Sequence, residues 1–431
     1  MKKKLVAVLL SVSMAMVACI GCSQIADTTD TGATTESTPV GETDIAGEVV
    51  DTDETAIESM ELVTVEISER GFDSLIQASD QYIFAYENGK YGLLNLAGEE
   101  VMPIEYDGYG GNMQDGCFCL GYKTSDTTWQ SYIFDSNLQV RFQNAERPNY
   151  YFASYHEDVF ELVEVSPEDG IADRLYVYAN IDGQPGYVFN EESIAGYNGS
   201  SAINNGTIMI RTYTRTPEGT FGCMFNVADK LVQGPAWWTP FPYAQTDSGY
   251  INGVEFDPET GSSIGMAVYN AKNDTITSLP SDIVVTKVFS KDSITVTATE
   301  DGYMSVQNNP EGPLAIYNVA KQEYATEYKY GYVGIQKHDT EGIILVSNED
   351  DTQWGYLDVE MNEVDAWYED ATDFSHGKAI IKDTDGLLYV VDSSLNKISE
   401  GFEGDSAAAL GDIENRFVVY RGDKCYLLTV K

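Results

Sequence analysis

The strongest constraint on the fold of this chain is a short pattern that recurs eight times. A brief apolar or aromatic segment ends in Asn or Asp, and a few small or polar residues follow before the next apolar residue. The copies end at Asn95, Asp135, Asn180, Asn226, Asn270, Asn318, Asp358 and Asp392. Their successive spacings are 40, 45, 46, 44, 48, 40 and 34 residues. A period of this length is that of one small antiparallel sheet with its turns, so the pattern predicts a β-repeat protein.

Each copy has the chemistry of a β-hairpin. The apolar residues pack on neighbouring strands, and the Asn or Asp side chain closes the turn by bonding to the backbone two residues on. Only residues 71–81 show modest helical periodicity, and the 29 tyrosines suit half-buried strands that need an apolar body and a polar tip. The chain is therefore predicted to be all-β.

The ends of the chain predict a closed ring. Residues 62–67 form a lone alternating strand, whereas residues 417–420 and 425–430 form a hairpin across residues 421–424. If the N-terminal strand completed the last unit, both sheet edges would be covered. We therefore expect a β-propeller of seven or eight blades, and an open β-repeat array is the alternative.

Two segments carry a recognisable motif. Residues 88–108 read Asn-Gly-Lys-Tyr-Gly-Leu-Leu-Asn-Leu-Ala-Gly-Glu-Glu-Val-Met-Pro-Ile-Glu-Tyr-Asp-Gly, and residues 353–386 contain Trp354-Gly355-Tyr356 and a later Ser375-His376-Gly377. These segments resemble the WG-containing repeat, with units near residues 88–122 and 352–404. Tyr91 replaces the family's Trp, and residues 123–330 keep only the strand and its Asx turn. The resemblance implies a repeat fold of bacterial lipoproteins and transfers no enzymatic activity.

The N-terminus has the composition of an export signal. Three lysines precede an apolar run of thirteen residues, which is too short to span a bilayer, and small residues and cysteines follow. Residues 1–21 are predicted to be a signal peptide, and Cys22, with Cys19 as the alternative, resembles the lipidated cysteine of bacterial lipoproteins. Residues 22–58 contain few large apolar side chains and are interpreted as a disordered acidic, Thr-rich stalk. Residues 59–431 would be a β-propeller-like repeat domain outside the cytoplasm, anchored to the cell membrane by the lipid. A plain signal peptide is the alternative.

The net charge limits the possible partners. With 25 basic and 69 acidic residues the formal charge is -44, so nucleic acid and anionic lipid headgroups, both polyanions, are excluded as partners. Four cysteines lie beyond the signal region: Cys117, Cys119, Cys223 and Cys425. Cys117 and Cys119 point to one face of a predicted strand, which makes a mutual disulfide awkward.

Sites for metals or catalysis are not apparent in the sequence. The three histidines, His156, His338 and His376, are far apart in polar segments and are predicted to be solvated loop residues. Residues 383–386 resemble the start of a calcium loop, but Ser394 stands where a bidentate Glu is needed, so a hairpin turn explains them better. No cofactor is expected, apart from weak calcium binding at acidic loops such as residues 348–351.

Residues 234–243 are the best candidate for a ligand surface. Three prolines argue against a central strand, so a loop or blade edge is expected there. It would display Trp237, Trp238, Phe241 and Tyr243 as ligand-binding aromatics, because such rings stack on sugars or on apolar side chains. The alternative is that the two tryptophans cover the end of the core. Trp129 and Trp367 are interpreted as ordinary strand aromatics, and Arg421-Gly422-Asp423 as hairpin turn chemistry rather than an adhesion motif.

These observations favour a non-enzymatic domain that binds a protein or glycan partner. The main alternative is a glycosidase or lyase with paired carboxylates at a propeller mouth. A third hypothesis is an envelope scaffold that docks another lipoprotein.

Overall fold

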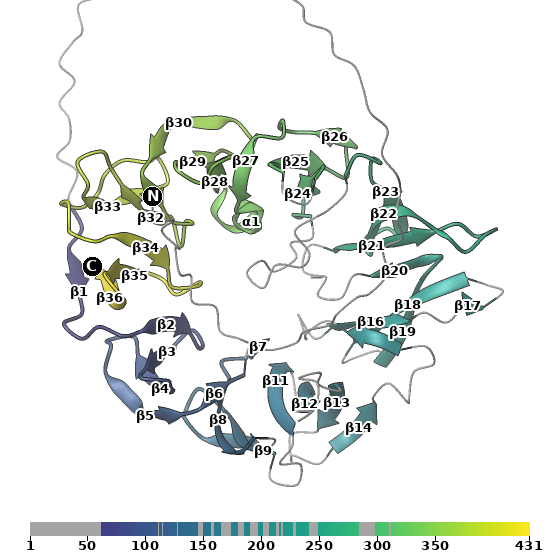
Figure 1. The fold of residues 1–431 in the computed structure, drawn as a ribbon, viewed down its shortest axis with the longest axis horizontal. Helices are drawn as coiled ribbons and strands as arrows, with labels where there is room; N and C mark the ends of the chain where they lie inside the picture. Colours follow the sequence, from purple (N-terminus) through teal and green to yellow (C-terminus); the bar gives the residue numbers. More distant parts are fainter. Residues whose placement is uncertain are drawn as a thin grey trace, which may run out of the picture.

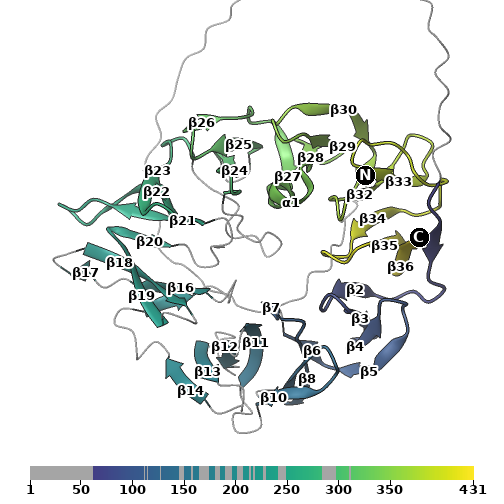
Figure 2. The same cartoon turned by 180° about the vertical axis from the view of Figure 1, so that it is seen from behind.

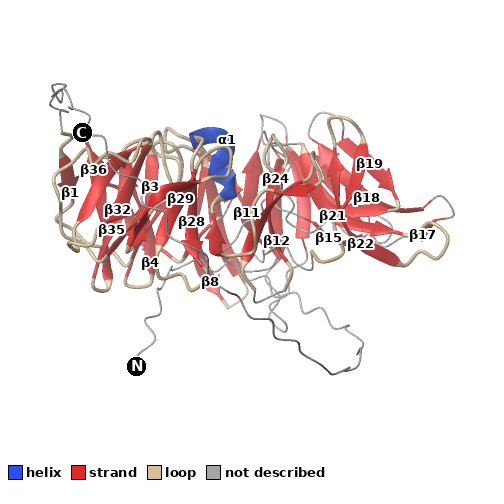
Figure 3. Cartoon of the chain, turned by 90° about the horizontal axis from the view of Figure 1, so that it is seen from above, coloured by secondary structure: helices blue, strands red, loops and turns tan. Residues whose placement is uncertain are grey.

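The computed structural model describes a chain built almost wholly from small antiparallel sheets. The described residues are 62–110, 112–113, 115–126, 128–144, 150–156, 159–164, 174–179, 185–189, 197–200, 207–212, 215–216, 219–226, 230–240, 249–283, 298–309 and 312–431. The sheets are arranged around a common centre as a β-propeller (Figure 1), and the strands run between the two faces of the ring (Figure 3). The prediction of an all-β propeller is confirmed. In the described part of the chain, no helix is long and apolar enough to cross a membrane.

The first half of the ring contains units 1 to 4. Unit 1 is β2 (Ser74–Gln77), β3 (Tyr82–Glu87), β4 (Lys90–Asn95) and β5 (Glu100–Tyr106). Unit 2 is β6 (Gly108–Tyr109), β8 (Phe118–Ser125), β9 (Thr128–Phe134) and β10 (Val140–Gln143). Unit 3 is β7 (Asn112–Met113), β11 (Tyr150–His156), β12 (Val159–Glu164), β13 (Arg174–Ala179) and β14 (Pro185–Phe189). Unit 4 is β15 (Tyr197–Ser200), β16 (Thr207–Thr212), β17 (Arg215–Thr216), β18 (Gly219–Asn226) and β19 (Lys230–Ala236).

The second half contains units 5 to 9. Unit 5 is β20 (Trp238–Pro240), β21 (Tyr250–Phe256), β22 (Ser263–Asn270) and β23 (Thr275–Ser278). Unit 6 is β24 (Tyr303–Gln307), β25 (Leu314–Asn318) and β26 (Glu323–Tyr324). Unit 7 is β27 (Tyr330–Val333), the 3₁₀ turn η2 (Ile335–Lys337), the helix α1 (His338–Glu341), β28 (Ile344–Asn348), β29 (Trp354–Leu357) and β30 (Glu363–Tyr368). Unit 8 is β31 (Asp370–Ala371), β32 (Lys378–Lys382) and β33 (Leu388–Asp392). Unit 9 is β34 (Ser406–Ala409), β35 (Arg416–Arg421), β36 (Lys424–Val430) and the N-terminal β1 (Val65–Ile67).

The eight sequence repeats are confirmed as strands of eight successive units. They correspond to β4, β9, β13, β18, β22, β25, β29 and β33. The described strands form seven sheets, because units 4 and 5 share one sheet through β18 and β20, and units 6 and 7 share another through β25 and β27. Unit 9 is not among the eight sequence copies because β36 does not end in Asn or Asp.

The Asx turns have the predicted hydrogen bonds. Asn95 Oδ1 accepts from the backbone N–H of Ala97 and of Glu99, both at 3.0 Å. Asp358 Oδ1 accepts in the same way from Glu360 (2.9 Å) and Asn362 (2.8 Å). The third residue after Asn95, Asp135, Asp358 and Asp392 is left-handed, which makes these three-residue hairpin loops that end in a bulge, whereas after Asn270 and Asn318 the fourth residue is left-handed. Non-glycine residues accept this strained conformation at Leu138 (φ 62°), Met361 (φ 66°) and Leu395 (φ 60°).

The core lies between neighbouring sheets. Between units 8 and 9, for example, Ile380, Val390 and Phe417 are fully buried in one cluster. Burial of apolar side chains between successive sheets holds each unit against the next, because a lone sheet has no second layer to cover its faces.

The ring is closed by its two ends. β1 pairs with β36 antiparallel, with Val65 opposite Val430 and Ile67 opposite Leu428. Phe72, just before unit 1, forms an isolated bridge with Cys425 of unit 9. Figures 1 and 2 show the purple N-terminal strand beside the yellow C-terminal unit. The predicted closure of the last unit by the N-terminal strand is confirmed.

Two segments show how local signals compare with the structure. Residues 71–81, which have modest helical periodicity, contain strand β2, because Leu75 is buried in the core between units 9 and 1. Residues 234–236 end β19, which pairs only with β18 and is thus the expected blade edge, whereas Trp238–Pro240 form β20 inside the sheet, between β18 and β21. Only three residues of β20 pair, so Pro240 at its end removes a single donor from the ladder.

Phe72→Ala tests the closure of the ring. Phe72 is 1% exposed and packs in the cluster that contains Cys425 and Leu427. We expect the substitution to lower the free energy of unfolding by about 3–5 kcal/mol, measured by chemical denaturation. Leu62→Ala, at a residue that is 45% exposed, should change it little. Equal effects of the two substitutions would contradict the closure described here.

Candidate functional site

Of the four aromatic residues predicted to bind a ligand, the structure describes Trp237 and Trp238. Trp238 is 1% exposed, its Nε1 donates to the carbonyl of Ala267 at 3.4 Å, and its ring lies 5.4 Å from that of Tyr269. Trp238 is therefore a core residue of unit 5, in line with the alternative interpretation. Trp237 is half-buried with a φ of 60°, and Phe241 and Tyr243 lie outside the described residues. Trp129 and Trp367 lie on β9 and β30, as expected.

The histidines also differ from expectation. His338 is buried, at 6% exposed, on α1, and its ring centroid lies 5.3 Å from that of Tyr303. The prediction of a solvated loop is wrong for His338 because a helical turn packs it against unit 6. His156 ends strand β11 rather than lying in a loop, whereas His376 is exposed in a turn.

The described cysteines are buried thiols. Cys117, Cys119 and Cys425 form no disulfide with one another, so the expectation that Cys117 and Cys119 form no mutual disulfide is confirmed. Burial raises the pKa of Cys119 to about 12 and that of Cys425 to about 11, which makes both thiols unreactive at neutral pH. The side chain of Cys223 and the lipidation candidates Cys19 and Cys22 lie outside the described residues.

The other motifs are occupied by structural contacts. Residues 383–386 form a hairpin turn in which Asp383 pairs with Lys397 and Asp385 accepts from the Tyr389 hydroxyl at 2.5 Å. Arg421 donates to the carbonyl of Glu403 at 2.9 Å beside a hollow of about 460 Å³. Within the described ranges, no group of three or more His, Cys, Asp or Glu side chains is arranged to hold a metal ion.

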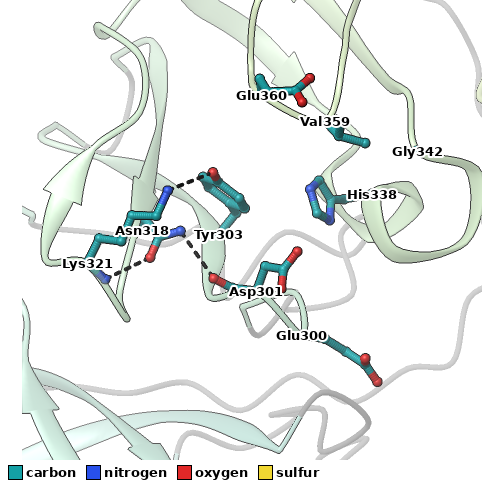
Figure 4. A pocket seen from close by; sticks show the side chains of 9 residues that line it. All are labelled: Glu300, Asp301, Tyr303, Asn318, Lys321, His338, Gly342, Val359 and Glu360. Atoms are coloured by element: carbon teal, nitrogen blue, oxygen red, sulfur yellow. Dashed lines mark hydrogen bonds between the residues drawn. The ribbon is translucent and has the colours of Figure 1, made fainter.

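A cavity lies between units 6 and 7, and we call it the rim pocket. It has a volume of about 630 Å³, within the range of ligand pockets. Figure 4 shows its lining. The lining residues are Glu300, Asp301, Tyr303, Asn318, Lys321, His338, Gly342, Val359 and Glu360.

Two walls of the rim pocket are turns of unit 6. Glu300 and Asp301 lie on a three-residue hairpin loop that Gly302 closes with a φ of 87°. Asn318 is the Asx residue of the sixth repeat copy. Its Nδ2 donates to the Asp301 carbonyl at 3.1 Å. Its Oδ1 accepts from the Lys321 amide at 2.9 Å. One buried repeat residue thus fixes both turns relative to each other.

The opposite walls come from unit 7. Val359 and Glu360 lie on the loop that Asp358 closes, so this wall is another repeat turn. His338 opens α1, and Gly342 ends it with a φ of 69° and an N–H bonded to the His338 carbonyl. Figure 4 shows the Tyr303 and His338 rings next to each other; their centroids lie 5.3 Å apart and their planes are tilted by 52°.

The charges in the rim pocket favour cations. Three carboxylates, those of Glu300, Asp301 and Glu360, line it. Lys321 already lies against its aromatic wall, with Nζ 5.5 Å from the Tyr303 ring centroid and 3.4 Å from the hydroxyl. A cation gains from both the carboxylates and the face of the tyrosine ring, so the pocket suits an ammonium or guanidinium group.

Two half-buried carboxyls lie in unit 8, Asp370 on β31 and Asp373 shortly after that strand. Burial raises the pKa of Asp370 and of Asp373 to about 6. Asp373 accepts from the Tyr332 hydroxyl at 3.3 Å, while its Oδ1 is buried without a hydrogen-bond partner and lies against Gly334. At neutral pH the ionised form of these carboxyls is unfavourable in the folded protein, because burial removes them from water.

Sequence reasoning missed α1 and therefore the rim pocket. The available signal was the polar segment 336–341 between Ile335 and Ile343, bounded by Gly334 and Gly342. Those two isoleucines are buried at the two ends of the segment. The contact of α1 with Tyr303, however, joins neighbouring units, and no local pattern encodes it.

Comparisons with known proteins concern the fold. No protein-family model and no curated protein matches the chain, so the resemblance to WG-containing repeats stays a prediction. The structure is similar to BamB from Moraxella catarrhalis (12% identity, covering 85% of this chain and 96% of that chain, TM-score 0.30). It is also similar to Sqt1 from Chaetomium thermophilum (12% identity, 83% and 99%, TM-score 0.36) and to the Dos1 propeller (9% identity, 74% and 92%, TM-score 0.37). No function is inferred from likenesses of this degree.

Asp373→Asn should stabilise the protein in a pH-dependent way. The pKa of Asp373 in the folded state, about 6, exceeds its ordinary value, so folding favours the protonated form. That contribution is fully present below about pH 4 and is lost as the pH rises through 6. We expect the variant to gain about 2 kcal/mol at pH 7.5 and almost nothing at pH 4, measured by denaturant unfolding. The exposed control Asp80→Asn should show no such trend; a gain for Asp373→Asn that is independent of pH would contradict the explanation.

Proposed function

We propose that this chain is a non-enzymatic binding module, displayed outside the cytoplasm by a lipid anchor at Cys22, that docks a basic protein partner in the rim pocket. The single observation that carries the proposal is the pocket itself, in which carboxylates from two units surround the paired rings of Tyr303 and His338. The formal charge of -44 supports it, because an acidic domain attracts basic partners over long range and repels acidic ones.

A protein ligand fits the pocket better than a glycan. Trp238, one of the aromatic residues expected to stack on sugars, is buried. The face of the Tyr303 ring is covered by Lys321. Lysine or arginine side chains of a partner would displace that internal ammonium and reach Asp301 and Glu360. Rigid sheets hold the turns that carry these groups, so the site is preorganised for recognition.

A binding role is favoured over the alternative of a glycosidase or lyase. Such an enzyme needs two carboxyls facing one substrate cavity, one of them with a raised pKa. In the part of the chain that the structure describes, the two carboxyls with raised pKa, Asp370 and Asp373, line neither the rim pocket nor the hollow at Arg421.

Binding of an octalysine peptide tests the docking proposal. The chain from Ser23 to Lys431 should bind the fluorescent peptide in an anisotropy titration, more weakly at higher salt. Asp301→Asn combined with Glu360→Gln should weaken binding about tenfold, because two charge-assisted contacts are lost. Lys321→Met should strengthen it about threefold by removing the internal competitor.

The matched control for these variants is Glu349→Gln combined with Asp350→Asn. It removes the same charge from the exposed turn after β28 and should weaken binding only slightly. Equal losses in the two double variants would indicate diffuse attraction and contradict the pocket. Binding of a neutral polysaccharide, unaffected by Asp301 and Glu360, would instead favour a glycan module.

Substitution of the lipidation candidates tests the anchor. Cys22→Ser should move the protein from the membrane fraction to the soluble fraction, whereas Cys19→Ser should leave it on the membrane. Fractionation and metabolic labelling with a fatty acid would measure both. The opposite result would assign the lipid to Cys19, and no labelling in the unsubstituted protein would contradict the anchor.

A further inference from the structure

The helix α1 cannot hold its own position. It has four residues, about one turn, and no side chain caps its N-terminus. A helix of this length is unstable by itself, because the entropy lost in ordering the first turn outweighs the free energy gained from its hydrogen bond. The orientation of His338 must therefore be set by contacts that α1 and η2 make with other units.

The apolar ends of this segment fix only where it starts and stops. Ile335 is fully buried in the core between units 6 and 7, and Ile343 is 6% exposed in the core between units 7 and 8. Hydrophobic contacts are non-directional, so these anchors leave the rotation of the intervening turn undetermined.

Glu341 supplies a directional contact to unit 8. Its Oε1 accepts from the His376 amide and its Oε2 from the Gly377 amide, both at 2.8 Å. His376 and Gly377 both have positive φ, in the tight turn between Ser375 and Lys378, which aims the two amides at one carboxylate. Two charge-assisted bonds with fixed donors define both the distance and the rotation of the helix end.

Lys337 supplies a second directional contact, to unit 9. Its Nζ pairs with Asp412 at 2.6 Å, and the Lys337 side chain is only 14% exposed. The Asp412 amide in turn donates to Gln77 Oε1 of unit 1 at 3.0 Å. The residue directly before α1 is thereby tied to the closing units of the ring.

We propose, resting on the proposed function, that Glu341 and Lys337 are positioning residues of the rim pocket. They hold α1 from both ends in the rotation that places the His338 ring opposite Tyr303. Neither residue lines the pocket, so their effect on ligand passes through His338. Units 8 and 9 thus determine the shape of a site that lies between units 6 and 7.

Two variants and one matched control test this role. Glu341→Ala removes both acceptors, and Lys337→Met keeps the aliphatic stem but removes the charge. The control Asp107→Ala removes a carboxylate that likewise joins two units, through Lys90 and the Lys123 amide (2.9 Å), on a part of the ring without α1. Octalysine affinity should fall about three- to tenfold in each variant and stay unchanged in the control.

The ring signal of His338 separates positioning from mere destabilisation. The chain has only three histidines, so ¹³C-labelled imidazole gives three assignable NMR signals. The Tyr303 ring current should displace the His338 signal in the unsubstituted protein and in the Asp107 control, and both variants should lose much of that displacement without ligand.

The outcomes keep the two proposals apart. If the unsubstituted chain does not bind octalysine, the proposed function fails, while the ligand-free His338 signal still decides the positioning role. An unchanged His338 signal in both variants overturns the role of Glu341 and Lys337. If Glu341→Ala does not fold, Lys337→Met decides the result alone.

Discussion

The structure depends on the pairing of its first strand with its last. β1 joins β36 over three residue pairs, and Phe72 continues the contact into unit 1. A ring of sheets has no inherent place to stop, because every unit exposes a face that needs a neighbour. The mixed unit 9 supplies that neighbour from both ends of the chain. Closure of the ring brings units 7, 9 and 1 close together. This allows Lys337 to contact Asp412, and Asp412 to contact Gln77.

One turn design serves both the fold and the candidate site. The Asx residue that makes each hairpin also fixes the loop after it in a single conformation, even where Leu or Met must adopt a left-handed backbone. In unit 6 that residue is Asn318, which is buried and bonds two turns at once. In unit 7 it is Asp358, whose loop carries Val359 and Glu360. The walls of the rim pocket are therefore ordinary repeat turns, and its particular chemistry lies in the residues at their tips.

Much of this architecture was predictable from the sequence. Hairpin chemistry is local, so the strand and Asx pattern identified eight units and the terminal strands indicated how the ring closes. Local patterns failed where tertiary contacts dominate. Leu75 belongs to a strand because it packs in the core between units 9 and 1, and Trp238, which composition suggested for a surface, is buried against residues of β21 and β22. The rim pocket depends on the contact between His338 of α1 and Tyr303 of the neighbouring unit, and local sequence patterns do not predict such a contact.

The closure of unit 9 has a consequence for how the chain is made. β1 is the first of the described strands to be synthesised, whereas its partner β36 is the last of them. Until then β1 has an unpaired edge, as does every unit that waits for its neighbour, and such edges invite pairing with other chains. Contacts of such long sequence separation also form slowly. The strong negative charge of the chain works against self-association during this delay, so the same acidity that would select a basic partner also protects the unfinished ring.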